Sequence, residues 1–321
     1  DLDLDRLQVL LKHTDMRARR LAQFELVARG KSGWERFQQV LKNASDPMAS
    51  IHSVWGLGMA AEVEPSLLEY LNPFLRDPSP AVRAQTARVL GDHRYAPATS
   101  QLIATVADAD PTVRRHAAIA CGRLADERAV DALIQLAVQD AATDTVLRHG
   151  ASWGLSQCAS AERLALLSEH DSVQARLAAV VALRLQANPL VATFLADSDA
   201  LVAVEAARAI SDVPIVDAYP QLAALAADES IQDEHLLRRV LNANLRLGEE
   251  ANATTLANLA TSDKRSERIR SDAIGMLASW KTPSPRHYIL SNWAPMEERD
   301  AAHANQLLAD FTGRGILEAP D

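Results

Sequence analysis

The sequence has few aromatic residues, few glycines and only two cysteines. Aromatic residues occupy 4% of the 321 positions and glycine 12 positions, although hydrophobic residues reach 48%. The core must therefore consist mainly of Ala, Leu and Val, which favours closely packed helices over a bulky sheet core. Cys121 and Cys158 lie far apart in the sequence. They predict neither a disulfide framework nor a CxxC metal or redox site.

Long apolar runs and an excess of positive charge are also missing. No apolar run approaches the roughly 20 residues of a membrane-spanning helix, so we expect no membrane span. The formal net charge is −9. Proteins that bind nucleic acid gain affinity from Lys and Arg that neutralise phosphates, so we expect no nucleic-acid partner. The chain starts at Asp1 without Met, and we expect a trimmed, mature or fragmentary form.

A turn followed by a helix recurs along most of the chain. In residues 77–92, two prolines interrupt the preceding helix, Asp77 or Ser79 can cap the next one, and Gly91 is expected to end it. Apolar residues follow the turn at i, i+4 and i+7, which places them on one helix face. Equivalent turn aspartates begin the other copies: Asp15, Asp46, Asp110, Asp144, Asp171, Asp199 and Asp233. A ninth copy without the aspartate begins near Lys264.

Each copy therefore consists of a short helix, a tight turn and a longer helix. One such hairpin cannot bury its apolar face alone, whereas stacked neighbours bury it continuously. The sequence predicts an all-α solenoid, or superhelix, of about nine short helical-hairpin repeats over residues 1–281. Residues 282–321 are expected to form a proline-rich turn and a C-terminal capping helix, at about 296–311, that covers the edge of the ninth repeat.

The turn and the run after it carry a resemblance to a known repeat. Residues 77–91 and 110–118 contain an Asp-Pro turn followed by Val-Arg and paired small residues. This pattern resembles the short HEAT-like repeats also found in phycobilisome bilin lyases, and the resemblance covers almost all of residues 1–312. It implies the solenoid fold and says little about function, because this repeat serves many partners.

Four segments carry a narrower resemblance: residues 15–19, 52–58, 237–244 and 283–286. They resemble the helical middle part of large secreted bacterial proteins with a sorbosone-dehydrogenase-like β-propeller before it and a cytochrome c domain after it. The resemblance implies a spacer between a redox domain and a haem domain, in the periplasm or outside the cell. This chain has no Cys-x-x-Cys-His motif for c-type haem, and no catalytic residue carries over from the resemblance.

Arginines recur just after the turns. A stacked row of arginines is one way to bind an anionic partner. Except for Arg270, however, each follows a turn aspartate, so we favour ion pairs within or between repeats that also satisfy the turn carbonyls. The members are Arg83, Arg114, Arg148, Arg176, Arg238 and Arg270.

Trp55, His149 and Trp153 lie opposite the apolar faces of their helices, about 200° to 240° from the helix position that starts the apolar stripe. In a solenoid this side often faces the concave surface, where an exposed Trp anchors a partner. The alternative is that these positions pack against the next repeat, because Ile119 and Val181 take equivalent places. The predicted concave-face contact residues are Trp55, Arg115, His149, Trp153 and Arg239.

The sequence gives little support for a catalytic or metal site. His52, His116 and His149 recur at similar places, but no His-Glu pair occurs. A HEAT-like hydroxylase of the deoxyhypusine type uses such pairs to hold iron. We expect no catalytic residue, no metal and no cofactor, and we expect Cys121 and Cys158 to be buried, inert thiols. A HEAT-like DNA glycosylase would need a basic concave face, which the acidic balance disfavours.

The sequence thus favours a non-catalytic, monomeric protein–protein interaction scaffold or interdomain spacer. Its partner is then another protein or adjacent domains of the same polypeptide, such as the propeller and the cytochrome c domain of the narrower resemblance. The alternative is a bilin-lyase-like enzyme, or another enzyme that binds a small ligand in the concave groove. Colour or catalysis in the isolated chain would favour the enzyme.

Overall fold

A computed structural model describes residues 2–43, 46–140 and 144–313. Within these ranges the regular elements are α-helices and short 3-10 helices, with one isolated bridge between Arg286 and Trp293. The chain divides into two compact units, residues 1–160 and 161–321. The predicted all-α solenoid of helical hairpins is confirmed in both. None of the described helices is both long enough and apolar enough to cross a membrane.

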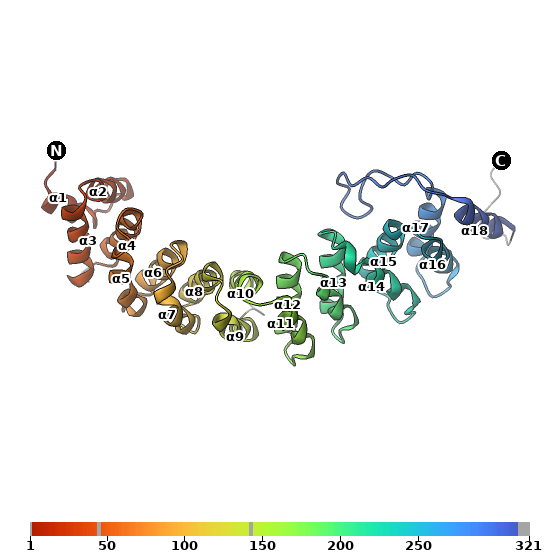
Figure 1. Cartoon of the computed structure of the whole chain (residues 1–321), viewed down its shortest axis with the longest axis horizontal. Coiled ribbons are helices and arrows are strands. Elements are labelled where there is room, and N and C mark those ends of the chain that lie inside the picture. Colours follow the sequence, from red (N-terminus) through yellow and green to blue (C-terminus); the bar gives the residue numbers. More distant parts are fainter. Residues whose placement is uncertain (1, 44–45, 141–143, 314–321) are drawn as a thin grey trace. The chain divides into compact units, whose positions relative to one another are not determined.

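The first unit stacks its hairpins so that the second helices form one layer and the first helices another (Figure 1). We call the second helix of each hairpin its B helix. The hairpins are α1 (Leu4–Leu10) with α2 (Met16–Ala28), α3 (Lys31–Asn43) with α4 (Pro47–Ala61), α5 (Leu67–Leu71) and η1 (Asn72–Arg76) with α6 (Pro80–Asp92), η2 (Ala96–Ala98) and α7 (Thr99–Thr105) with α8 (Pro111–Leu124), and η3 (Glu127–Ala129) and α9 (Val130–Asp140) with α10 (Thr145–Cys158).

The second unit has the same hairpin pattern, and 3-10 helices form part or all of three of its described first helices. Its elements are α11 (Ala161–Ala165) and η4 (Leu166–Glu169) with α12 (Val173–Leu185), η5 (Pro189–Ala196) with α13 (Ala200–Asp212), η6 (Val216–Ala218), α14 (Tyr219–Ala224) and η7 (Leu225–Ala227) with α15 (Glu234–Leu247), and α16 (Glu250–Thr261) with α17 (Glu267–Ala278). The last helix is α18 (Ala302–Gly313).

Aspartates cap most B helices, as predicted. Asp46 and Asp110, for example, each accept hydrogen bonds from the two backbone N–H groups that follow the first helical residue. The turns before α6 and α12 differ, because their N-cap residues are Ser79 and Ser172, not the aspartates Asp77 and Asp171, and neither serine side chain makes a capping bond. Asp77 instead accepts a bond from the backbone N–H of Ser79 at 2.8 Å and shapes the turn.

Small residues bring the B helices close together. Gly91 was expected to end α6, but the helix continues through it to Asp92. The expectation was wrong because Gly91 serves the packing: a Cβ atom built on it would lie 2.6 Å from Cβ of Ala120 in α8. A Cβ on Gly154 in α10 would likewise lie 3.0 Å from the carbonyl oxygen of Ala118.

Helix α18 is the predicted capping helix, and it packs on α16 and α17. Ala304 and Phe311 are buried there in one cluster with Trp280. The helix begins at residue 302 rather than near 296. Arg299 explains the delay, since its backbone N–H bonds to Lys281 and its guanidinium bonds to the carbonyls of Trp280 and Leu245. The division at residue 281 stays a prediction.

The glycine packing can be tested with one substitution at two positions. Gly91→Ala should lower the free energy of unfolding by about 1–3 kcal/mol, because the methyl group overpacks the α6–α8 contact. Gly275→Ala should raise it by roughly 0.5–1 kcal/mol, since a Cβ there meets no atom within 4 Å and Ala is the better helix former. Urea unfolding measures both. Equal effects at the two positions would refute the close-approach explanation.

Candidate functional site

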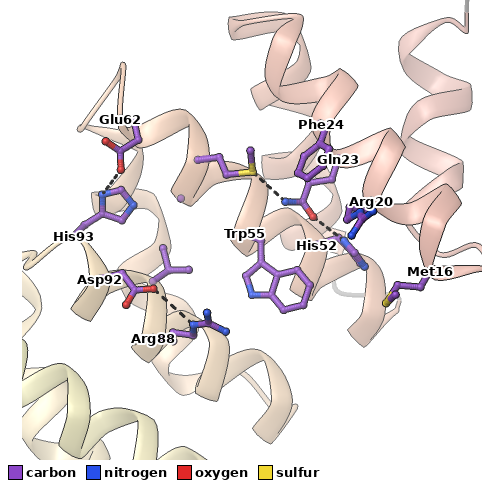
Figure 2. A pocket seen from close by; sticks show the side chains of 13 residues that line it. Met16, Arg20, Gln23, Phe24, His52, Trp55, Glu62, Arg88, Asp92 and His93 are labelled. Atoms are coloured by element: carbon purple, nitrogen blue, oxygen red, sulfur yellow. Dashed lines mark hydrogen bonds and ion pairs between the residues drawn. The ribbon is translucent and has the colours of Figure 1, made fainter.

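The B helices of the first unit carry an open, largely apolar hollow of about 660 Å³ across α2, α4 and α6 (Figure 2). We call it the α2–α6 groove. Three of its apolar side chains are exposed: Met16 by 60%, Phe24 by 45% and Met59 by 42%. Its lining residues are Met16, Arg20, Gln23, Phe24, His52, Trp55, Gly58, Met59, Glu62, Arg88, Val89, Asp92 and His93.

The helix caps set which residues face this groove. Nine residues after the N-caps Asp15, Asp46 and Ser79 stand Phe24, Trp55 and Arg88, and all three line the groove. Because the caps begin the three helices in the same register, equivalent positions come side by side on one face.

A polar chain with His52 and Gln23 buried at its centre joins α2 to α4 beneath the groove. Nε of Arg19 donates to Nε2 of His52 at 3.1 Å, and Nδ1 of His52 lies 2.7 Å from Oε1 of Gln23. Nε2 accepts, so Nδ1 carries the proton and donates it to Gln23. Gln23 then donates to the sulfur of Met59 at 3.3 Å. Burial, and then the nearby positive charge of Arg19, lower the pKa of His52 to about 4, so His52 is neutral at pH 7.

Aromatic and charged groups complete the groove. The ring of Trp55 meets that of His52 edge to face at 5.1 Å, and its Nε1–H donates to Gln85 at 3.0 Å. Ion pairs tie up charges on the far rim, where Arg88 lies 3.6 Å from Asp92. Arg20 is exposed on the near rim, and no described residue pairs with it. The groove thus offers aromatic and thioether surface beside a cation, Arg20, that is exposed and unpaired within the described ranges.

The structure separates the other predicted contact residues from this groove. His149 is exposed on α10, while Trp153 is half-buried, with its ring against Gly122 of α8. Arg115 lies beside Gly150 of α10, and its guanidinium lies 3.0 Å from the ring of His116. Within the first unit, only Trp55 of the predicted set lines the groove.

Arg239 belongs to the second unit and is buried. Its guanidinium forms two bonds to the carboxylate of Asp212, at 2.9 and 3.2 Å, and a third to the carbonyl of His235. Its charge is therefore already paired. The roles of all five predicted residues as partner contacts stay predictions.

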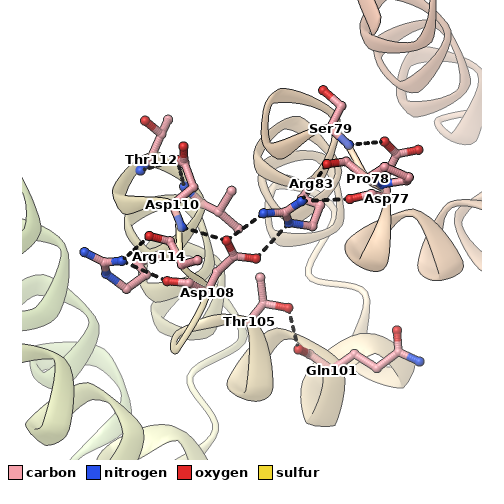
Figure 3. Close-up of polar contacts among 12 residues, drawn as sticks. Asp77, Pro78, Ser79, Arg83, Gln101, Thr105, Asp108, Asp110, Thr112 and Arg114 are labelled. Atoms are coloured by element: carbon pink, nitrogen blue, oxygen red, sulfur yellow. Dashed lines mark hydrogen bonds and ion pairs between the residues drawn. The ribbon is translucent and has the colours of Figure 1, made fainter.

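Two of the arginines after the turns, Arg83 and Arg176, bind a carboxylate of the next repeat as well as their own turn, as Figure 3 shows for Arg83. Its guanidinium donates to the carbonyls of Asp77, at 2.8 Å, and Pro78, at 3.2 Å, in its own turn. It also donates to both carboxylate oxygens of Asp108 in the next repeat, each at 2.8 Å. Asp108 also accepts from the backbone N–H of Asp110. The favoured interpretation of paired, structural arginines is confirmed here, although the partner lies two residues before the aligned aspartate.

The second unit repeats this arrangement once and varies it once. Arg176 donates to the carbonyls of His170 and Asp171 and pairs with Asp197 at 2.7 Å.

Arg238 stands five residues after its cap, whereas Arg83 and Arg176 stand four residues after theirs. It lies 3.9 Å from the carboxylate of Asp272 in α17 and 4.8 Å from the ring centre of Tyr288, in the segment that follows α17. Arg83 and Arg176 act as structural links, whereas Arg238 also contacts a non-helical segment.

The cysteines and histidines do not assemble into a reactive centre in the part of the chain that the structure describes. Both cysteines are buried, and burial raises the pKa of Cys121 to about 12 and that of Cys158 to about 11. Such thiols are poor nucleophiles. Among the described residues, no three His, Cys, Asp or Glu side chains gather where they could hold a metal ion.

Sequence reasoning missed most of the groove, including Phe24, Met16, Met59 and Arg20. Phe24 was within reach, because it stands at the same distance from its cap as Trp55. Met16 and Met59 gave no such signal, since apolar residues on a helix are usually buried and only the packing leaves these two exposed.

A family model described as HEAT repeats matches residues 64–156 and 97–185. The predicted HEAT-like character is confirmed, and the fold is a HEAT-repeat solenoid. No match was found among curated proteins.

Solved structures also show similarity to the chain. One is an engineered protein (18% identity, 100% of this chain, 96% of that chain, TM-score 0.42). A second is YibA of E. coli (19% identity, 86% of this chain, 93% of that chain, TM-score 0.44). A third is the complex of CpcE and CpcF of phycocyanin lyase from Nostoc sp. PCC7120 (18% identity, 97% of this chain, 95% of that chain, TM-score 0.35).

The neutral, buried His52 predicts a loss of stability in acid. Its folded-state pKa lies near 4, below the ordinary 6.5, so between these values the unfolded chain binds the proton first and unfolding becomes easier as the pH falls. His52→Asn keeps a donor for Gln23. After allowance for solvent screening, it should reduce the difference in the free energy of unfolding between pH 7 and pH 4.5 by about 1–2 kcal/mol. Thermal unfolding at pH 7 and pH 4.5 measures it. His149→Asn, at an exposed position, is the control and should leave the dependence unchanged.

The link between repeats can be tested at Asp108. Asp108→Asn keeps an acceptor for the N–H of Asp110 but loses the charge opposite Arg83, so the free energy of unfolding should fall by about 2 kcal/mol. The Arg83 guanidinium also holds the pKa of Asp108 below its usual value, so this contribution is present at neutral pH and lost as the pH falls through that lowered pKa. The control is Asp15→Asn, which loses only an exposed pair and should change stability little.

Proposed function

We propose that this protein is a non-catalytic interaction scaffold that binds a protein partner in the α2–α6 groove. The observation that carries the proposal is the exposed cluster of Met16, Phe24 and Met59 beside Trp55 in one hollow. Exposed apolar clusters rimmed by polar groups are typical of protein interfaces, and aromatic residues and Met are enriched there.

Rigidity of the groove floor supports the proposal. The bonds from Arg19 through His52 and Gln23 to Met59 hold α2 and α4 in one arrangement. A surface that is ordered before binding loses less conformational entropy when the partner arrives. Methionine side chains above this floor adapt to the partner's shape.

The chemistry of the groove speaks against catalysis as its role. His52 is the most recessed titratable group there, and both of its ring nitrogens are already bonded to Arg19 and Gln23. A general base needs a free nitrogen within reach of the substrate, and a pKa near 4 makes this ring a weak base at pH 7.

The proposal extends to the context suggested by the narrower resemblance of the sequence. In that context the scaffold is an interdomain spacer, and the partner is an adjacent domain of the same polypeptide, such as the dehydrogenase-like propeller or the cytochrome c domain. Support for this part comes from residues 15–19, 52–58, 237–244 and 283–286 alone.

Binding measurements on groove variants test the scaffold. A partner found with the immobilised chain is identified, purified and titrated against the full chain by calorimetry. Phe24→Ala and Trp55→Ala should each weaken binding by about 2 kcal/mol, roughly 30-fold, because interface aromatics in such hollows are hot spots. Leu21→Ala removes an apolar side chain of α2 that is more exposed than Phe24 but lies outside the groove, and it should have little effect.

Each outcome decides the proposal. Unfolding curves first confirm that Trp55→Ala is folded, and the exposed Phe24 provides the second, milder variant. A purified partner that binds both variants as tightly as the unchanged chain would refute the groove as its site. Turnover of a small molecule by the isolated chain, lost in the same variants, would favour the enzyme alternative.

A further inference from the structure

The second unit already holds a non-helical segment on its own B helices. Residues 281–296, which we call the B-face loop, follow α17 and turn back over this layer (Figure 1). The loop is paired with itself, since the backbone N–H of Ala294 bonds to the carbonyl of Pro285 and that of His287 to Asn292. A tight turn at its tip is closed by the bond from Ser291 to His287.

Side chains of two B helices, α15 and α17, hold this loop. His287 is buried, with Nε2 lying 3.4 Å from the side-chain nitrogen of Asn242 in α15. Tyr288 lies beneath the guanidinium of Arg238, and its hydroxyl bonds to Asp272 in α17. Arg246 donates to the carbonyl of Ala294 at 3.3 Å.

The helix positions that hold the loop are equivalent to those that line the open groove. Counted from the cap Asp233, Arg238, Asn242 and Arg246 stand five, nine and thirteen residues on. Counted from Asp15, Arg20 and Phe24 stand five and nine residues on.

Helix α4 adds two further positions of the same register. Counted from the cap Asp46, Trp55 and Met59 stand nine and thirteen residues on. The same turns of equivalent helices therefore carry a loop in one unit and an open hollow in the other.

We infer that the α2–α6 groove binds a protruding, non-helical loop of the partner with an aromatic residue at its tip. The inference rests on the proposed function and names the shape and chemistry of the partner. Arg20, which pairs with no described residue, takes the place of Arg238, and its guanidinium stacks on the aromatic ring of the incoming loop. Phe24, Trp55 and Met59 receive a neighbouring apolar side chain.

Selection from a library of displayed 12-residue peptides, each closed into a loop by a terminal disulfide, tests this inference on the full chain. Enriched loops should contain a Tyr, Trp or Phe near the middle. Their Kd should rise at least tenfold with Arg20→Ala and with Phe24→Ala, and should stay unchanged with Leu21→Ala. Arg20 and Phe24 are exposed, so both variants should fold normally.

A parallel selection from a library of helical peptides separates this inference from the proposed function. Helical binders that compete with the partner and respond to Phe24→Ala would overturn the loop inference and leave the groove as the binding site. The absence of any loop that depends on the groove would likewise overturn it. A different result would refute the proposed function itself: a purified partner that binds all groove variants with the same affinity as the unchanged chain.

Discussion

Close contact between neighbouring B helices is the constraint on which the structure depends. Gly91 faces Ala120, and Gly154 faces Ala118, with too little room for one more methyl group. Helices that approach so closely bury continuous surface with small side chains, which explains how a chain with 4% aromatic residues builds a core. Larger side chains are then left for the face that no neighbouring helix covers.

The caps give this packing a fixed register. Because Asp15 and Asp46 end the turns before their helices in the same way, equivalent positions of successive B helices come side by side. Arginines such as Arg83 and Arg176 add a second connection, since each binds its own turn and a carboxylate of the next repeat. Equivalent positions of successive B helices in the first unit thus lie in rows on one face, while the side chains at these positions differ from repeat to repeat.

The sequence was sufficient to predict the helices, the turns and the repeat number, because capping and apolar periodicity are local properties. Contacts between repeats were harder to predict. Asp108 was overlooked as the partner of Arg83, because the alignment followed the capping residue Asp110 and the reach of an arginine across a repeat is a matter of packing. The start of α18 was misplaced for a similar reason, since Arg299 is held by carbonyls from α15 and the end of α17.

The candidate site was also predictable only in part, because some of its features are local and others depend on packing between repeats. Trp55 could be singled out from its place opposite the apolar face, but the exposure of Met16 and Met59 follows only from how α2, α4 and α6 meet. Exposed hydrophobic side chains cost little where the partner later covers them, whereas the same residues would weaken solubility on a free surface. In the first two B helices, the groove residues Arg20, Phe24, Trp55 and Met59 stand five, nine or thirteen residues after their caps. In the proposed function, recognition of the partner depends on these side chains.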